Sequence, residues 1–518
     1  MERFLYKKPE KNPKINLWMA YPAIESFAMA SLGYLSIFKM FDCDEELYTE
    51  RIYSDTKTYT VPVEYVHAMG FSVSFELDIL NIIKMLKKYG FSLKNKERKE
   101  EEPIIFAGGP VLMSNFKPFE EFFDFIAVGE MCCLKSAVEI LKKKDELSRD
   151  EILKQLSNVE GIYVPRYPKK TKITRDNLED EIFYTPILSE KSYFKDTFVI
   201  EIERGCPKMC NFCLASWLNQ PVRFVDYEKI IKTIDLGLEY TNKIALLGAY
   251  VAGHPNFEEI IDYISKKVDS GYEIELSVSS LRADWVDDAL IKTLVKCGQK
   301  TATIALEAGS QRLRDYIQKD LTEEQILNTV YTAQKNGLKG LKIYVIIGLP
   351  KEEMSDIEEL VSLVKKIKKQ IKQEGGGFDI TISTSTFVPK PHTPFELTKR
   401  QDKKILEDKI NYLKKEFHLL GVDFRSPSIE WDMVQTILSV TCESLADFLI
   451  EFEEEGGSLG AFKKLWRKRQ KDIKKGNCTA KVNTCNIPYN SIEAPEWEII
   501  DCNSCSLKKR KQKELFDY

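Results

Sequence analysis

Apolar runs that end in Gly, Pro or Ser recur along the first 130 residues, with segments of helical spacing between them. The runs cover residues 15–22, 66–74, 103–110 and 123–130, and the helical segments cover 28–40, 78–89 and 135–143. Runs without an alternating polar face are typical of strands buried on both sides, and their alternation with helices is typical of βαβ units. The pattern therefore predicts an α/β domain with an open, Rossmann-like parallel sheet.

The same alternation resumes after residue 195. Apolar runs at 198–203, 244–249, 273–281, 301–306, 341–350 and 379–387 are each followed by a loop or a helical segment. Six such strand–helix units predict closure as a partial (β/α)₆ barrel of the TIM type, with functional groups at the carboxyl ends of the strands.

These patterns divide the chain into four parts. We expect a Rossmann-like domain over 1–163, a connection rich in Pro, Lys and polar residues over 164–195, the partial barrel over 196–425 and a small mixed region over 426–518. The last region has helical stretches from 432 to 455, a Gly-Gly break and a basic segment at 461–475. A basic segment is a feature of RNA contacts, but a solvated helix face is the commoner explanation.

Composition limits the binding partners and the cellular compartment that we expect for the protein. Hydrophobic residues make up 43% of the chain and charged residues 30%, while the net charge is only −4, which argues against general polyanion binding. No apolar run reaches transmembrane length, and the first residues do not read as a signal peptide, so we expect a cytoplasmic protein with no membrane contact. Twelve cysteines in a reducing compartment indicate metal rather than disulfides.

The strand ends of the first domain carry small and polar residues. In parallel sheets ligands bind at these carboxyl ends, and glycine there lets the backbone approach a flat or bulky ligand. The candidate ligand contacts are Pro22, Ser72, Ser74, Gly108, Gly109, Pro110, Gly129 and Glu130.

Three cysteines follow the first strand of the second domain: Cys206, Cys210 and Cys213. Thiolates are soft ligands that favour iron–sulfur clusters, copper(I) or zinc. Structural metal sites usually close all four positions, whereas three ligands leave one position open for another group. A zinc loop with its fourth ligand elsewhere in the chain is the alternative.

This stretch resembles the CxxxCxΦC signature of the radical S-adenosylmethionine (SAM) superfamily, with Phe212 as the aromatic residue. The resemblance implies a four-iron four-sulfur cluster on the three cysteines. The open iron would chelate the amino and carboxylate groups of SAM, whose reductive cleavage yields a 5′-deoxyadenosyl radical. It also implies a reductant such as flavodoxin or ferredoxin as a partner.

The resemblance extends to the other strand ends. Gly248 stands where the family has a GGE-type loop for the methionine amino group, although the glycine pair and the acid are missing here. Glu307 suits the ribose hydroxyls, since a carboxylate accepts hydrogen bonds from both. Arg282 or Arg314 would pair with the methionine carboxylate. Ile346 and the backbone of Phe212 would meet the adenine.

The first domain resembles the cobalamin-binding domain that precedes the radical domain in many superfamily members. The segments 70–78, 108–110 and 128–130 carry this likeness, and so do 307–314 and 387–394 further along the chain. One feature departs from the methionine-synthase type. The loop at 21–26 lacks the DxHxxG motif, so the resemblance implies cobalamin without a His ligand from this loop. A vestigial domain that binds nothing is the alternative.

These expectations combine into one leading function, the methylation of an unactivated carbon with SAM and cobalamin. A rearrangement or cyclisation with the same cofactors is the second possibility, and a non-catalytic cobalamin or redox sensor is the third. The substrate is not encoded in any motif and belongs to one of three classes: a small molecule, a peptide or an RNA.

Four cysteines near the C-terminus form a separate candidate site: Cys478, Cys485, Cys502 and Cys505. The last two make a CxxC pair, which is ligand-like spacing. We expect a structural zinc or a second cluster here; a disordered tail with spare thiols is the alternative.

Overall fold

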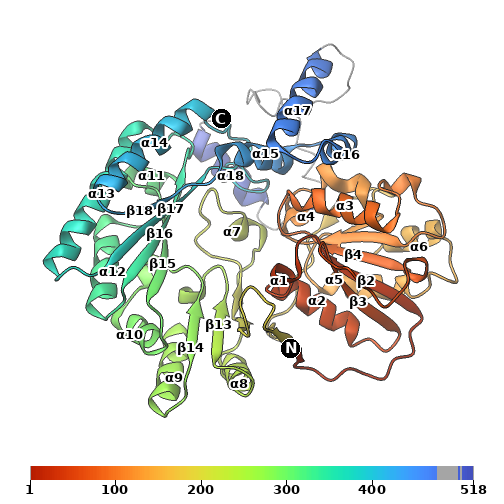
Figure 1. Ribbon diagram of the computed structural model, residues 1–518, viewed down its shortest axis with the longest axis horizontal. Helices are drawn as coiled ribbons and strands as arrows, with labels where there is room; N and C mark the ends of the chain where they lie inside the picture. The colour runs from red at the N-terminus through yellow and green to blue at the C-terminus, as the bar shows by residue number, and fades with distance from the viewer. Residues whose placement is uncertain (1, 475–499, 502–504, 517–518) are drawn as a thin grey trace.

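The computed structural model describes residues 2–474, 500–501 and 505–516. Two α/β lobes lie side by side (Figure 1). The N-terminal lobe contains a six-stranded sheet in the order β3-β2-β4-β5-β6-β7. Its strands are β2 (Ile15–Tyr21), β3 (Leu47–Tyr53), β4 (Ala68–Ser72), β5 (Ile104–Gly108), β6 (Phe125–Ala127) and β7 (Ile162–Tyr163). Only β7 runs antiparallel to its neighbour.

The apolar runs of this lobe explain its layers. Every residue of β4 except the last is buried, as expected for a strand covered on both faces. The helices around the sheet are α1 (Glu25–Ala28), α2 (Leu32–Asp42), α3 (Asp78–Tyr89), α4 (Pro110–Ser114), α5 (Cys132–Leu141) and α6 (Arg149–Leu156). Helix α3 ends at Gly90, whose φ of 75° terminates the helix in the left-handed conformation. The four predicted strands and the parallel sheet are confirmed, but β3 was missed because charged residues interrupt its apolar pattern.

The central lobe contains all six predicted strands. They are β10 (Phe198–Glu201), β13 (Lys243–Leu247), β14 (Glu275–Val278), β15 (Thr301–Glu307), β16 (Gly340–Ile347) and β17 (Asp379–Thr386). The order β10-β13-β14 continues through a parallel bridge between Leu281 and Ile304 into β15-β16-β17-β18. Strand β18 (Asp423–Arg425), parallel to β17, extends the series beyond the prediction.

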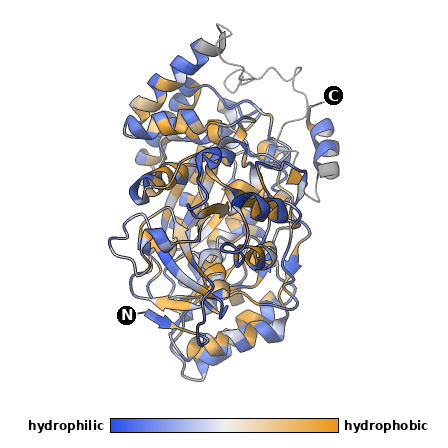
Figure 2. Ribbon diagram, turned by 90° about the vertical axis from the view of Figure 1, so that its right-hand side faces the viewer, coloured by the Kyte–Doolittle hydropathy of each residue, from blue (hydrophilic) through white to orange (hydrophobic). Residues whose placement is uncertain are grey.

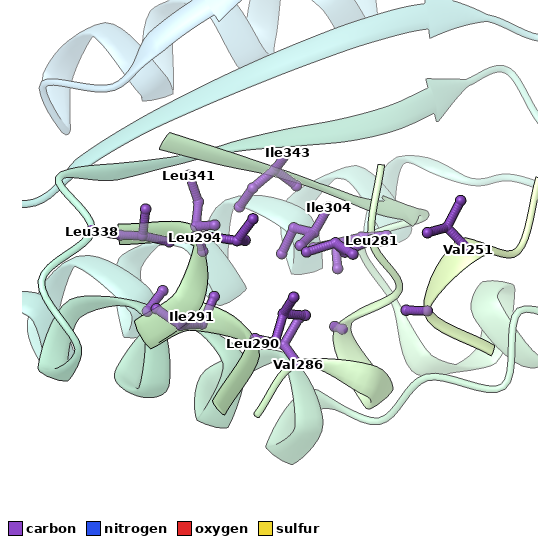
Figure 3. Packing of buried hydrophobic residues seen from close by; sticks show 14 of the residues in the cluster. Val251, Leu281, Val286, Leu290, Ile291, Leu294, Ile304, Leu338, Leu341 and Ile343 are labelled. Carbon is purple, nitrogen blue, oxygen red and sulfur yellow. The ribbon is translucent and has the colours of Figure 1, made fainter. Parts of the chain in front are cut away.

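Helices cover one face of these central strands. They are α8 (Tyr227–Leu238), α9 (Phe257–Asp269), α10 (Asp288–Lys296), α11 (Gln311–Tyr316), α12 (Glu323–Lys335), α13 (Met354–Gln373) and α14 (Lys403–Leu419). Leu290, Ile291 and Leu294 of α10 point toward Ile304 and Ile343 of the sheet (Figure 3). This apolar contact leaves the carboxyl ends of the strands to the polar loops that follow them.

The segments after residue 425 connect the two lobes. Helices α15 (Ile429–Val440), α16 (Ala446–Glu454) and α17 (Leu459–Lys474) run from the central lobe over α3 of the N-terminal lobe (Figure 1). Asn115 donates hydrogen bonds to the carbonyl oxygens of Ser439 and Thr441 across this contact. Helix α18 (Cys505–Phe516) returns to the central lobe. The predicted helical region is therefore two helices separated at 441–445.

Two short strand pairs anchor the connection at 164–195. Strand β1 (Glu2–Phe4) pairs antiparallel with β9 (Ile187–Ser189), and β8 (Thr171–Lys172) pairs with β19 (Ile500–Asp501).

Hydrophobic residues concentrate inside the molecule and hydrophilic residues on the outer faces of the helices (Figure 2). Within the described part of the chain, no helix combines the length and apolarity needed to cross a membrane.

Candidate functional site at the junction of the lobes

The cysteine loop lies between β11 (Glu203–Arg204) and α7 (Leu214–Leu218). Cys206 and Cys210 are buried, Cys213 is partly buried, and all three thiols are free. Gly205 has a φ of 98°, and a Cβ there would lie 2.6 Å from the carbonyl oxygen of Asn219, so only glycine fits this turn. The loop thus folds back tightly on α7.

Hydrogen bonds fix the loop from several directions. The indole of Trp217 donates to the carbonyl of Cys210 at 2.9 Å, and the amide of Gln220 donates to that of Cys206 at 2.9 Å. The side chain and backbone N–H of Asn211 donate to Tyr316 and Ile317, at 2.8 and 3.0 Å. The cysteines are therefore held in place by α7 and by the segment after α11.

Burial and nearby cations act in opposite directions on the thiols of the cysteine loop. Burial raises the pKa of Cys210 to about 12, and the positive charges of Lys319 and Arg282 act against this rise. Among the described residues, no three His, Cys, Asp or Glu side chains form a site for a single metal ion. A cubane cluster does not need one, because each of its thiolates binds a different iron. The donor set of three thiols on one rigid loop, with two cations beside it, fits a cluster.

The predicted SAM contacts occupy different environments. Glu307, at the end of β15, has a φ of 66° and forms an ion pair with Lys319 at 3.2 Å. Arg282 pairs with Asp284 at 2.9 Å and donates to the carbonyl of Lys319 at 2.7 Å. Glu307 and Arg282 are thus joined through Lys319, close to the cluster loop.

The structure corrects the expectation that Arg314 could pair with the methionine carboxylate. Its side chain is buried and donates to the carbonyl oxygens of Leu321 and Gly309 at 2.8 and 2.7 Å, so the guanidinium fixes its own loop. It is not available to a ligand carboxylate, which leaves Arg282 as the candidate.

Phe212 and Ile346 meet in one apolar cluster. Leu349, Phe387 and Phe395 form its buried part, and Leu515 of α18 packs against it together with Phe212 and Ile346. The predicted adenine contacts therefore lie together. The contribution of α18 was missed, because its basic sequence carries no signal of a buried role.

A cavity of about 430 Å³ lies between the lobes at the carboxyl ends of β2, β4, β5 and β6. We call it the interlobe cavity. Seven predicted ligand contacts line it: Ser72, Ser74, Gly108, Gly109, Pro110, Gly129 and Glu130. Glu201, Arg204, Asn219 and Leu247 close it from the central lobe. The cavity therefore reaches the residues that flank the cysteine loop.

Pro22 is the exception among the predicted contacts. It is buried, its carbonyl accepts a hydrogen bond from Asn81 at 2.8 Å, and it does not line the cavity. Instead the first turn of α2 contributes Ser31, Leu32 and Gly33. A Cβ on Gly33 would meet no atom within 4 Å, so this turn leaves open space. The small residues Ser31 and Gly33 were the available signal for this wall.

Glu130 lines the cavity but makes ion pairs with the central lobe. Its carboxylate accepts from Arg223 at 2.6 and 2.7 Å and also from Arg204, two residues before Cys206. Burial acts to raise the pKa of Glu130, but the hydrogen bond from Arg223 and the charges of both arginines hold it below its usual range. Glu130 thus links the cavity wall to the cluster loop, a role that its position at a strand end did not reveal.

The proposed metal site near the C-terminus stays a prediction. Cys478, Cys485 and Cys502 fall outside the described residues, and Cys505 begins α18.

Comparison with known proteins agrees with this geometry. The family model of the radical SAM superfamily matches residues 200–364, and that of the N-terminal part of radical SAM proteins matches 37–165. An uncharacterised protein of Methanocaldococcus jannaschii is 33% identical over 406 residues, covering 77% of this chain and 83% of its own.

This chain belongs to the radical SAM superfamily.

Two further relatives bear on its fold and chemistry. An uncharacterised methyltransferase of Pyrococcus horikoshii is 26% identical over 48% of this chain and 50% of its own length. A solved structure of the cobalamin-dependent SAM radical enzyme OxsB, with aqua-cobalamin and SAM bound, matches 97% of this chain and 84% of its own, with a TM-score of 0.52 and 14% identity. The radical SAM protein described here therefore has an α/β fold similar to that of OxsB.

Proposed function

We propose that this radical SAM enzyme holds a four-iron four-sulfur cluster on Cys206, Cys210 and Cys213, binds cobalamin in the interlobe cavity, and methylates an unactivated carbon. The observation that carries the proposal is the interlobe cavity itself. Its N-terminal wall includes the strand ends predicted for cobalamin, and its other wall includes Arg204, which precedes the cluster loop, and Asn219, whose carbonyl lies against Gly205 of that loop. A cofactor there would lie next to the radical source.

The residues present fit these groups. The cavity of about 430 Å³ is of the size usual for small-ligand sites, and a corrinoid, which is larger, would extend from it past the open space at Gly33 toward solvent. No His belongs to the lining of the cavity, all of which is in the described part of the chain, so the residues present would hold cobalamin without a His ligand. When bound, the cluster and SAM supply a carbon radical, and cobalamin supplies a methyl group.

The chain's own groups have distinct tasks in this proposal. Lys319 and Arg282 offset the negative charge of the cluster and orient the acids Glu307 and Asp284. Phe212 and Ile346 provide an apolar wall for the adenine. The central strands act as a partial (β/α)₆ barrel that brings these strand ends together. OxsB binds cobalamin and SAM, which supports the choice of cofactors. The Pyrococcus relative is named a methyltransferase, which supports the choice of methylation over rearrangement.

The first test is SAM cleavage. Protein reconstituted anaerobically with iron and sulfide and reduced with dithionite should release 5′-deoxyadenosine. Cys210→Ala should abolish the release, whereas Cys297→Ala, which removes a buried thiol of the central lobe, should retain it. Full activity of Cys210→Ala would overturn the cluster assignment.

The second test is cobalamin binding. Protein from cells grown with cobalamin should retain a corrinoid whose cobalt(II) spectrum lacks coupling to a His nitrogen. Gly33→Leu should fill the cavity and reduce retention at least tenfold. Gly460→Leu is the matched control, since both glycines are exposed and occupy the second position of a helix. Equal retention by the two variants would place the corrinoid elsewhere.

The third test distinguishes methylation from rearrangement. Cell fractions enriched in small molecules, peptides or RNA are incubated with SAM that carries a deuterated methyl group. A product that gains the label supports methylation and reveals the substrate class. A product that forms without the label indicates rearrangement or cyclisation.

A further inference from the structure

A fully buried carboxylate lies beside the cluster loop and has no task in the proposal so far. Glu203, three residues before Cys206, is 0% exposed. Its Oε1 accepts a short hydrogen bond from the backbone N–H of Tyr250, and its Oε2 has no hydrogen-bond partner among the described residues. Burial raises the pKa of Glu203 to about 7, while the backbone N–H groups of Tyr250 and Ala249 oppose the rise. A buried carboxylate with one oxygen left without a hydrogen bond is costly, which suggests that Glu203 serves a function.

The carboxylate of Glu203 occupies the space that a side chain at residue 248 would need. A Cβ at Gly248 would lie 2.0 Å from Oε1 of Glu203, so any side chain would displace the carboxylate. The contact follows from the sheet, because the N–H of Ile202 donates to the carbonyl of Leu247 at 3.0 Å and so brings the next residues side by side. The carboxylate thus braces the loop 248–250 from the neighbouring strand.

This braced loop borders the cluster loop. Glu203 and Tyr250 both lie close enough to Cys206 to interact with it electrostatically. The hydroxyl of Ser279 donates to the carbonyl of Gly248 at 3.1 Å, which fixes the loop from the next strand. Leu247, just before the loop, lines the interlobe cavity. A ligand held at the cluster loop would therefore have the loop 248–250 nearby.

We propose that Glu203 is a positioning residue for SAM, which holds the loop 248–250 against the cluster loop so that the loop receives the amino group of the ligand. Glu203 supplies from the neighbouring strand the acid that the loop itself lacks. Its negative charge also favours a cationic amino group nearby. The inference rests on the proposed binding of SAM at the cluster.

The test compares variants that remove the brace in different ways. Glu203→Ala deletes the carboxylate, Glu203→Gln keeps an acceptor for Tyr250 but removes the charge, and Gly248→Ala displaces the carboxylate by collision. Each protein is reconstituted, its iron content measured, and its affinity for SAM determined by anaerobic equilibrium dialysis. The paramagnetic resonance spectrum of the reduced cluster is recorded with and without SAM.

We expect all three variants to keep the cluster. Glu203→Ala and Gly248→Ala should bind SAM at least tenfold more weakly, with KM raised more than kcat is lowered and a smaller spectral change on adding SAM. Glu203→Gln should lose about threefold. The double variant Glu203→Ala/Gly248→Ala should be no weaker than Glu203→Ala, because the collision then disappears.

Two outcomes would overturn the inference. If the affinity of Glu203→Ala for SAM is within twofold of that of the parent protein, Glu203 has no positioning role. Loss of iron from Glu203→Gln, in which shape is kept, would make the residue a support of the cluster instead. If the parent protein with a full cluster binds no SAM, the proposed function fails rather than the role of Glu203.

Discussion

At the scale of single residues, the site depends on which buried charges have protein partners. Arg282 and Arg314 both come after strand ends in the sequence, and either was expected to pair with the carboxylate of the ligand. Arg314 donates only to carbonyl and amide oxygens of its own loop, whereas Arg282 forms an ion pair next to the cluster loop. The difference separates Arg314, which maintains the fold, from Arg282, the residue that we propose to contact SAM.

Arg314→Ala should therefore lower stability and leave the affinity for SAM unchanged. The carbonyl groups of Leu321 and Gly309 would lose their donor inside the protein, at a cost of about 1–3 kcal/mol for each group. Arg282→Ala should do the opposite and weaken SAM binding with little change in melting temperature. Calorimetry and dialysis on the two variants check this, and a tenfold loss of SAM affinity in Arg314→Ala would contradict it.

Asp78 at the start of α3 provides a test of pH dependence. Burial raises the pKa of Asp78 to about 6, above its ordinary value of 3.8. The folded state therefore holds the proton more tightly than the unfolded state, and stability falls as the pH rises from about 4 to 6, by up to about 3 kcal/mol. Asp78→Asn should gain in stability relative to the parent over this range. A constant difference between the two proteins from pH 4 to 7 would show that Asp78 does not titrate in this way.

At the scale of elements, a helix far along the chain contacts the apolar residues around Phe212, next to the cysteine loop. Leu515 of α18 packs against the same group of apolar side chains as Phe212 and Ile346. Lys508, also in α18, forms a buried ion pair with Glu396 at 2.9 Å. The sequence of α18 is mostly basic, so hydrophobic periodicity does not reveal the contact.

Leu515→Ala should weaken SAM binding about fivefold and leave the iron content unchanged. Removing a half-buried leucine side chain costs about 1 kcal/mol of apolar contact, which corresponds to roughly this factor. Leu419→Ala at the end of α14 is the control, because Leu419 is 70% exposed and packs against little. Equal SAM affinities of the two variants would remove α18 from the site.

At the scale of the whole molecule, the two lobes are joined by a buried ion network as well as by helices. Glu130 of the N-terminal lobe binds Arg204 and Arg223 of the central lobe, and the backbone N–H of Asp176 in the connection donates to the same carboxylate at 2.7 Å. Because Arg204 lies two residues before Cys206, this network determines how the interlobe cavity faces the cluster loop.

Glu130→Gln should loosen the junction. Breaking a buried charge pair typically costs about 3–5 kcal/mol, since the remaining arginines stay desolvated. We expect a lower melting temperature and faster protease cleavage within residues 164–195. Glu139→Gln, in which an exposed carboxylate of the same lobe is changed, should behave like the parent. Unchanged cleavage of Glu130→Gln would mean that the helices alone join the lobes.

The sequence by itself determined the features that depend on local chemistry. The spacing of Cys206, Cys210 and Cys213 predicts the cluster loop, because three thiolates on one short loop are able to bind one centre. The apolar runs identify four strands of the first sheet and all six predicted strands of the second, because a strand covered on both faces tolerates few polar residues. The strand ends with Ser72, Gly108 and Gly129 point to the interlobe cavity, because ligands bind at the carboxyl ends of parallel strands.

Only the tertiary structure decided the features that depend on contacts between distant segments. The ion pairs of Glu130 with Arg204 and Arg223, the fit of Glu203 to Gly248 and the packing of Leu515 against the Phe212 cluster each join residues from different elements. A charged side chain has the same appearance in the sequence whether it meets a ligand, an ion-pair partner or a backbone carbonyl. Its partner is selected by burial and geometry, because an unpaired charge inside the protein is too costly to leave in place.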